Sequence, residues 1–187
     1  MSRPSANLRL FVGLYPPVEI AERLIASLRR LDLPPHRLTP LEQVHLTLQF
    51  VGDLPSRQLE ATIESVKRAT GGLTRFSLTP LRLITLPNRN RAPARLAAAE
   101  TDAPPALLEL QRRLATRLAR NVRKRPGDRF LAHITLCRFR SPKRMGPLEH
   151  DLDLPVFEVD EIRLMRSELK PTGAVHHELI ACPLGGN

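Results

Sequence analysis

Two histidines of this chain begin the same four-residue pattern. Residues 45–48 are HLTL and residues 133–136 are HITL, 88 positions apart in a chain of 187 residues. With six histidines in the chain, chance gives two such matches in about one or two sequences per thousand. Alternate side chains of a β-strand share a face, so in each pattern His and Thr point one way and the apolar residues the other. We therefore expect each pattern to present an imidazole and a hydroxyl together.

Two imidazoles and two hydroxyls suit acid–base chemistry on a phosphodiester. Histidine titrates near about pH 6.5, so His45 and His133 could be one protonated and one neutral around a single phosphate. Thr47 and Thr135 would donate hydrogen bonds to its oxygens. A metal site is the weaker interpretation, because the residue at +2 is Thr and no carboxylate lies close by, so we predict no metal. A half-buried strand with an incidental histidine explains one copy of the motif better than it explains two.

The surrounding sequence predicts that both motifs lie in strands, each preceded by a helix and a turn. Strands are expected at 7–14, 44–51, 75–86, 95–100, 129–139, 157–169 and 176–184, and helices at 18–30, 57–69 and 104–122. Gly52-Asp53 is expected to close the first motif strand, and Ser56 to cap the helix at 57–69. Strands and helices mix without the regular alternation of a doubly wound sheet. This predicts an α+β fold, one domain over residues 1–187 with one active strand in each half.

Composition and charge narrow the class of partner. The chain carries 29 Lys and Arg against 19 acidic residues, a formal net charge of +10. Such a surface attracts polyanions, although Arg-rich usage is also typical of GC-rich genomes. The two cysteines, Cys137 and Cys182, lie inside apolar runs and not in a metal-binding or redox spacing. No apolar run approaches the roughly 20 residues of a membrane span, and the first residues lack a signal-peptide core. We therefore expect a cytoplasmic protein with no membrane association, and a monomer.

Four segments together resemble a known family. RLFVGLYPP, VHLTLQFVGD, FLAHITLCRF and LMRSELKPTGAVHHELIACPL are similar to the two-histidine phosphoesterase superfamily. Within it the chain resembles the bacterial and archaeal RNA 2′,3′-cyclic phosphodiesterases, also called 2′-5′ RNA ligase-like proteins. The resemblance implies two pseudo-symmetric lobes of antiparallel sheet flanked by helices, with a central cleft carrying one H-x-T-x motif per lobe. It also implies hydrolysis of RNA 2′,3′-cyclic phosphate ends, including those of tRNA fragments, to a 2′-phosphate without metal or cofactor.

The resemblance also implies residue roles. His45 would protonate the departing 3′ oxygen and His133 would activate the attacking water. Arg138 would contact the phosphate and Phe50 would stack on the terminal base. Both lie five residues after a motif histidine, and an odd offset turns a regular strand's side chain to the opposite face. They reach the site only if each strand twists, bulges or ends just past HLTL and HITL.

Three departures from the family pattern are visible. Ala132 stands where a Pro is common, His176 where a Tyr is usual, and an aromatic residue is missing around Ala97. Basic residues outside the motifs have two interpretations: Arg89, Arg91 and Arg95 are expected to guide RNA, and Arg113, Arg117, Arg120 and Lys124 to form a solvated helix face. The remaining histidines, His36, His150 and His177, are expected at the surface.

Other functions remain open on these residues. One is a 2′-5′ RNA ligase that joins tRNA halves, and another is a non-catalytic RNA-binding module. A small nucleotide such as ADP-ribose cyclic phosphate is a further substrate class.

Overall fold

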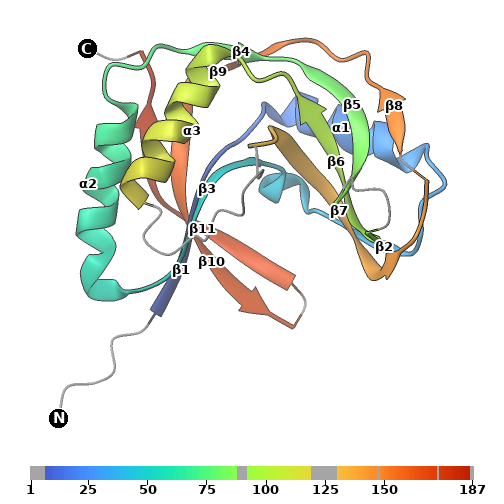
Figure 1. Cartoon of the computed structure of the whole chain (residues 1–187), viewed down its shortest axis with the longest axis horizontal. Coiled ribbons are helices and arrows are strands. Elements are labelled where there is room, and N and C mark those ends of the chain that lie inside the picture. Colours follow the sequence, from blue (N-terminus) through green and yellow to red (C-terminus); the bar gives the residue numbers. More distant parts are fainter. Residues whose placement is uncertain (1–6, 88–91, 119–129, 147, 172, 186–187) are drawn as a thin grey trace.

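Most of the chain's strands belong to one antiparallel sheet. The computed structural model describes residues 7–87, 92–118, 130–146, 148–171 and 173–185. In this part of the chain the sheet has nine strands in the order β11–β10–β1–β3–β7–β6–β5–β8, with β2 also paired to β7 (Figure 1). The nine strands are β1 (Asn7–Leu14), β2 (His36–Leu38), β3 (Leu46–Pro55), β5 (Pro80–Leu86), β6 (Ala94–Thr101), β7 (His133–Lys143), β8 (Glu149–Asp151), β10 (Glu161–Lys170) and β11 (Gly173–Pro183). β4 (Phe76–Leu78) and β9 (Phe157–Val159) form a separate pair. The α+β class predicted from the sequence is confirmed.

The sheet divides at its middle into two parts. We call β11–β10–β1–β3 the first half-sheet, and β7–β6–β5–β8 with β2 the second half-sheet. They are joined where β3 meets β7, and the ladder there consists of one residue pair. Chain order is mirrored across this junction, because β1 and then a helix precede β3 just as β6 and then a helix precede β7.

The two helices that precede the motif strands bury one apolar stripe each. In α1 (Val18–Arg29) the stripe contains Leu24 and Leu28, and in α3 (Pro105–Leu118) it contains Leu110 and Leu114. This spacing of three and four residues is the reason that these segments form amphipathic helices. α1 packs against β7 and α3 against β3, so each helix supports the motif strand of the other half-sheet.

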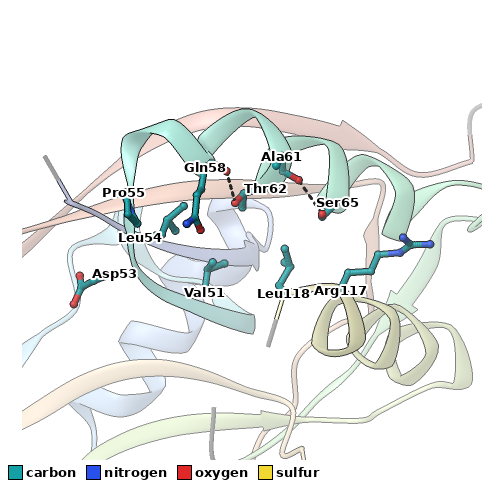
Figure 2. A pocket seen from close by; sticks show the side chains of 10 residues that line it. All are labelled: Val51, Asp53, Leu54, Pro55, Gln58, Ala61, Thr62, Ser65, Arg117 and Leu118. Carbon is teal, nitrogen blue, oxygen red and sulfur yellow. Dashed lines mark hydrogen bonds between the residues drawn. The ribbon is translucent and has the colours of Figure 1, made fainter. Parts of the chain in front are cut away.

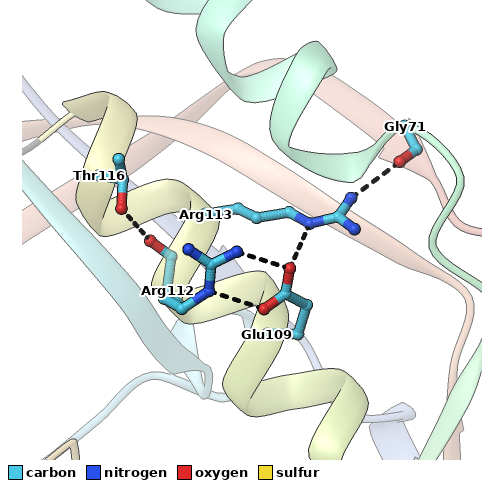
Figure 3. A network of polar contacts seen from close by, with 5 residues as sticks. All are labelled: Gly71, Glu109, Arg112, Arg113 and Thr116. Carbon is cyan, nitrogen blue, oxygen red and sulfur yellow. Dashed lines mark hydrogen bonds and ion pairs between the residues drawn. The ribbon is translucent and has the colours of Figure 1, made fainter.

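A third helix, α2 (Leu59–Thr70), lies beside α3 (Figure 1). Figure 3 shows the polar contacts that link them. Arg113 of α3 donates to Glu109 at 2.8 Å and to the carbonyl of Gly71, just past α2, at 2.9 Å. Hydrogen bonds from Arg112 and then from Arg113 lower the pKa of Glu109 to about 2. Arg113 is therefore occupied in joining two helices.

Several boundaries differ from the sequence-based prediction. β3 continues through Gly52 to Pro55, because Gly52 adopts a positive φ of 85° inside the strand and does not end it. A short 3₁₀ helix (Ser56–Gln58) precedes α2, so Gln58 and not Ser56 takes the N-cap position. The strand expected at 157–169 is divided into β9 and β10. The three-residue strands β2 and β8 were not predicted, and positions 119–122 of the expected third helix lie outside the described residues.

Candidate active site

A single residue pair brings the two motifs together. Leu46 of β3 pairs with Ile134 of β7, and both side chains are fully buried in the core. Each of them directly follows a motif histidine. Continuing the antiparallel register by one residue on each side sets each motif histidine opposite the threonine of the other motif, on the face turned away from the core. The four half-buried residues on that face are His45, Thr47, His133 and Thr135.

Both imidazoles are oriented by the same backbone contact. Nδ1 of His45 lies 2.6 Å from the carbonyl oxygen of Gln43, and Nδ1 of His133 lies 2.8 Å from that of Leu131. A carbonyl only accepts, so Nδ1 carries the proton in both rings and Nε2 remains for a substrate. Nε2 of His45 lies 3.1 Å from the hydroxyl of Thr47, which donates to it in the neutral ring.

Burial keeps both imidazoles neutral near pH 7. It lowers the pKa of His45 to about 4, against the opposing hydrogen bond to Gln43, and the nearby His176, His133 and Arg138 lower it further. The pKa of His133 is also lowered, first by burial and then by Arg138. An entering phosphate anion has the opposite effect, because it favours the protonated form of both rings.

β3 contains a bulge directly after the first motif. Thr47 pairs with Gly13 of β1 but Gln49 pairs with Val12, so one extra residue, Leu48, stands between them. The extra residue reverses the alternation of faces. Phe50 therefore lies opposite Phe11, on the face of the motif, with their ring centroids 6.4 Å apart.

β7 contains the same irregularity after the second motif. Thr135 pairs with Ala98 of β6 and Cys137 pairs with Ala97, which leaves Leu136 as the extra residue. Leu136 and Cys137 are both fully buried, and Arg138 is exposed. Arg138 is thereby turned to the face of His133, close enough to lower its pKa. Both strands contain the break that the odd offset of five residues requires.

Phe11 and Gly13 of β1, with Tyr15 directly after the strand, surround His45, and the sequence-based reasoning missed them. The ring of His45 stacks on Phe11 with centroids 4.9 Å apart and lies 5.4 Å from the ring of Tyr15. Gly13 stands between these two, and a Cβ there would lie 3.2 Å from Cδ2 of His45. The absence of a side chain at Gly13 lets the imidazole lie against β1. The signal available in the sequence was the period of two that sets Phe11 and Gly13 on one face of the strand.

His176 of β11 also reaches this site. Its ring lies edge-on to His45, with centroids 5.2 Å apart, and edge-on to Phe11 at 4.8 Å. Within the described chain, two buried side-chain polar atoms have no hydrogen-bond partner, Nδ1 of His176 and the hydroxyl of Tyr15. Burial raises the pKa of Tyr15 to about 12, so Tyr15 stays a neutral phenol. Both unpartnered atoms belong to rings that contact His45.

The tip of the β10–β11 hairpin meets the second half-sheet at β2. A Cβ on Gly173, whose φ is 129°, would collide with the guanidinium of Arg37. Arg37 pairs in turn with Arg138 of β7. The contact between Gly173 and Arg37 therefore links the two half-sheets on the side where Arg138 lies.

Among the described residues, no hydrogen bond, ion pair or ring contact joins the other predicted histidines or Arg95 to His45 or His133. His150 and His177 are exposed, and His36 is half-buried with Nδ1 at 2.8 Å from the carbonyl of Pro34. Arg95 of β6 is exposed. Four of the predicted basic residues lie outside the described part of the chain: Arg89, Arg91, Arg120 and Lys124. Within the described residues, no three His, Cys, Asp or Glu side chains gather as a metal ion would require.

A cavity of about 170 Å³ lies elsewhere, where the end of β3 meets α2 and α3 (Figure 2). Its hydroxyl groups are already used: Thr62 donates to the carbonyl of Gln58 at 2.9 Å, and Ser65 to that of Ala61 at 2.8 Å. No motif residue lines it. The central cleft between lobes stays a prediction.

Comparisons with known proteins identify the family of this chain. The family model described as the 2′-5′ RNA ligase superfamily matches residues 16–171. A protein of Thermus thermophilus named RNA 2′,3′-cyclic phosphodiesterase is 30% identical, over 96% of this chain and 91% of its own length. A protein of the same name from Thermotoga maritima is 29% identical over 78% of each chain.

Solved structures share the fold. The crystal structure of TT0787 from Thermus thermophilus aligns with a TM-score of 0.77 and 28% identity, over 95% of this chain and 98% of that one. Escherichia coli LigT complexed with 3′-AMP aligns with a TM-score of 0.78 and 23% identity, over 96% and 99%. Because the family model matches residues 16–171, which are most of this chain, the chain belongs to the 2′-5′ RNA ligase superfamily.

Proposed function

We propose that this protein is an RNA 2′,3′-cyclic phosphodiesterase that opens the cyclic end to a 2′-phosphate without a metal ion. The observation that carries the proposal is the junction of β3 and β7, where two oriented imidazoles share one face with two hydroxyls. Membership of the superfamily supports it, as do the relatives that carry the name of this activity.

The reaction divides between the two histidines. His133 takes a proton from water, whose oxygen attacks the phosphorus. The bond from phosphorus to the 3′ oxygen breaks, and His45 gives that oxygen a proton, so the phosphate remains on the 2′ oxygen. A pKa of about 4 makes His45 a poor base. The bound phosphate anion favours the protonated ring, so His45 takes up a proton from solvent and then acts as the acid. Each step leaves one ring protonated and the other neutral, and solvent restores the starting state.

The other groups on this face hold the phosphate and the base. Thr47 and Thr135 donate hydrogen bonds to the non-bridging oxygens of the phosphate, and Arg138 stabilises the negative charge that grows in the transition state. Phe50 is 59% exposed, so its ring is accessible to a ligand. It stacks on the terminal base, which suits any base since each has a flat π-face.

The charge on β7 supports an RNA substrate. Residues 130–148 contain no acidic residue, and they carry the exposed cations Arg138, Arg140, Lys143 and Arg144. None of the four forms an ion pair with another described residue. A row of unneutralised cations that begins at the site fits the phosphates upstream of a cyclic end.

The proposal extends to organisation and setting. The chain is one domain of two pseudo-repeat lobes, which the mirrored strand order supports. It acts as a monomer in the cytoplasm, and fragments of tRNA are among its substrates; Cys137 and Cys182 are free, buried thiols, which fits that setting. No helix in the described chain is long and apolar enough to span a membrane.

One second function has an observation in its favour. The matched family model is named for 2′-5′ RNA ligation. With a 5′ hydroxyl in place of water, His133 would take the hydroxyl proton, its oxygen would attack the phosphorus, and the bond to the 3′ oxygen would break as His45 protonates that oxygen. Incubation with tRNA halves and analysis for a joined product separates ligation from hydrolysis.

The test uses an oligoribonucleotide that ends in a 2′,3′-cyclic phosphate, with a chelator present. We expect a 2′-phosphate product, and loss of activity in His45→Ala and in His133→Ala. His150→Ala, which removes an exposed histidine outside the site, is the matched control and keeps full activity. The proposal fails if wild-type protein gives no turnover, or if turnover survives either motif substitution. No turnover by wild-type protein, together with RNA binding and a cellular role that survive substitution of both motif histidines, would instead support a non-catalytic RNA-binding module.

A further inference from the structure

His176 is a third imidazole at the site, and neither motif contains it. It pairs with Ser167 of β10 near the tip of the β10–β11 hairpin. Its ring contacts His45 and Phe11 at centroid distances of 5.2 and 4.8 Å. It is brought there from the last strand of the chain, 131 residues after His45.

The surroundings of the ring fix which nitrogen carries its proton. Nδ1 is buried and has no hydrogen-bond partner among the described residues, whereas Nε2 is not enclosed in this way. An orphaned N–H donor is rarer inside proteins than an orphaned acceptor. Nδ1 therefore holds the bare lone pair, and the proton lies on Nε2.

We propose that His176 contacts the substrate as a neutral donor, with Nε2–H hydrogen-bonded to a non-bridging oxygen of the cyclic phosphate that His45 also contacts. This inference rests on the proposed function and names a further residue of the same site. His176 would be a catalytic residue in addition to the two motif pairs, with no proton to give or take.

The groups that face His176 favour its neutral form. From β1 the facing group is Phe11, from the segment just before β3 it is His45, and from β10 it is Ser167, none of which supplies a negative charge. The carboxylate of Glu178, two residues along β11, lies 3.4 Å from Arg163 and is occupied by that ion pair. Burial and then His177 lower the pKa of His176. The ring has no counter-charge that would hold a second proton.

The experiment compares side chains that do or do not present a donor at this position. His176→Tyr and His176→Gln keep a polar hydrogen, whereas His176→Phe and His176→Leu keep the size without it. We expect the two apolar variants to lose about 10- to 100-fold in kcat/KM on the cyclic-phosphate oligonucleotide, the range for a hydrogen bond to a charged group. The two donor variants should stay within about fivefold of wild type.

The matched control is the neighbouring histidine on the same strand. His177 is exposed on the opposite face, where its Nε2 lies 3.4 Å from Glu168. His177→Phe should keep wild-type kcat/KM. Thermal melting of every variant identifies loss of folding, and the Gln and Leu pair replaces the Tyr and Phe pair where an aromatic variant is unstable.

The pH profile tests whether the donor is neutral. If His176 stays uncharged, His176→Leu lowers kcat/KM by the same factor from about pH 5.5 to about pH 8.5. A loss that appears only at low pH would overturn the neutral role. Equal activity of the donor and apolar variants would overturn the contact itself.

Failure of this inference is distinct from failure of the proposed function. Inactive His45→Ala together with fully active His176→Leu rejects the role of His176 and leaves the phosphodiesterase in place. Fully active His45→Ala rejects the phosphodiesterase mechanism and with it the role of His176.

Discussion

The depressed pKa of His45 predicts that part of the folding stability depends on pH. In the unfolded chain this imidazole has its ordinary pKa of 6.5, and in the folded chain its pKa is about 4. Between these values the unfolded state takes up a proton that the folded state refuses. The contribution of His45 to the free energy of unfolding is therefore fully present above about pH 6.5. It decreases as the pH falls below that value and stops decreasing near pH 4.

The size of the effect follows from the two pKa values. Between about pH 7 and about pH 4.5 the linkage relation gives a loss of about 2 kcal/mol in the free energy of unfolding from His45 alone. Other groups titrate over the same range, so the useful quantity is a difference between proteins. His45→Gln has no ring to protonate, and its free energy of unfolding should fall by about 2 kcal/mol less than that of wild type.

Urea unfolding at the two pH values measures this difference. His150→Gln removes an exposed histidine and should behave as wild type does. Equal losses in wild type and His45→Gln would refute the burial of a neutral imidazole at this position. A larger loss in His45→Gln would reverse the sign of the shift.

Three further predictions concern the substrate. Arg138→Gln should lower kcat by about 100-fold while the melting temperature is unchanged, because a donor to the developing charge is lost; unaltered kcat would remove Arg138 from the phosphate. Phe50→Ala should raise KM for an oligonucleotide about 10-fold with little effect on kcat, whereas Phe50→Tyr should leave KM unchanged because its flat ring still stacks on the base. Equal KM values for both variants would exclude this stacking. Arg140→Gln with Arg144→Gln should flatten the salt dependence of KM for an oligonucleotide, by a slope of about 0.7 for each lost phosphate contact, and leave a mononucleotide cyclic phosphate unaffected; an unchanged slope would place the RNA elsewhere.

The alternation within each motif was predictable, because it depends only on the period of a strand. His45 and Thr47 share a face in any regular strand, as do His133 and Thr135. The same rule gave the wrong face for Phe50 until a bulge was assumed. The bulge is a property of the pairing between β3 and β1, where two residues of one strand oppose a single step of the other. The residues of β3 alone do not encode that pairing.

The residues that contact His45 could not be predicted either, because they depend on how strands distant in the sequence pair. Phe11 and Gly13 share one face of the strand predicted at 7–14, but nothing local showed that β1 would lie beside β3. His176 comes from the far end of the chain and reaches the site through β10. Gly52 led to the opposite error, since a Gly-Asp pair usually ends a strand, whereas here the strand bends and continues. Short strands such as β2 have too few residues to show a period.

The central claim is that two imidazoles act on one phosphate, and a double-mutant cycle tests it most directly. It compares kcat/KM of wild type, His45→Ala, His133→Ala and the double variant on the same cyclic-phosphate oligonucleotide with chelator present. We expect each single substitution to cost about 10²- to 10⁴-fold, the usual contribution of a general acid or base. The double variant should lose little more than the worse single variant, because acid and base serve the same step. Losses that multiply in the double variant, or a single variant that keeps full activity, would contradict it.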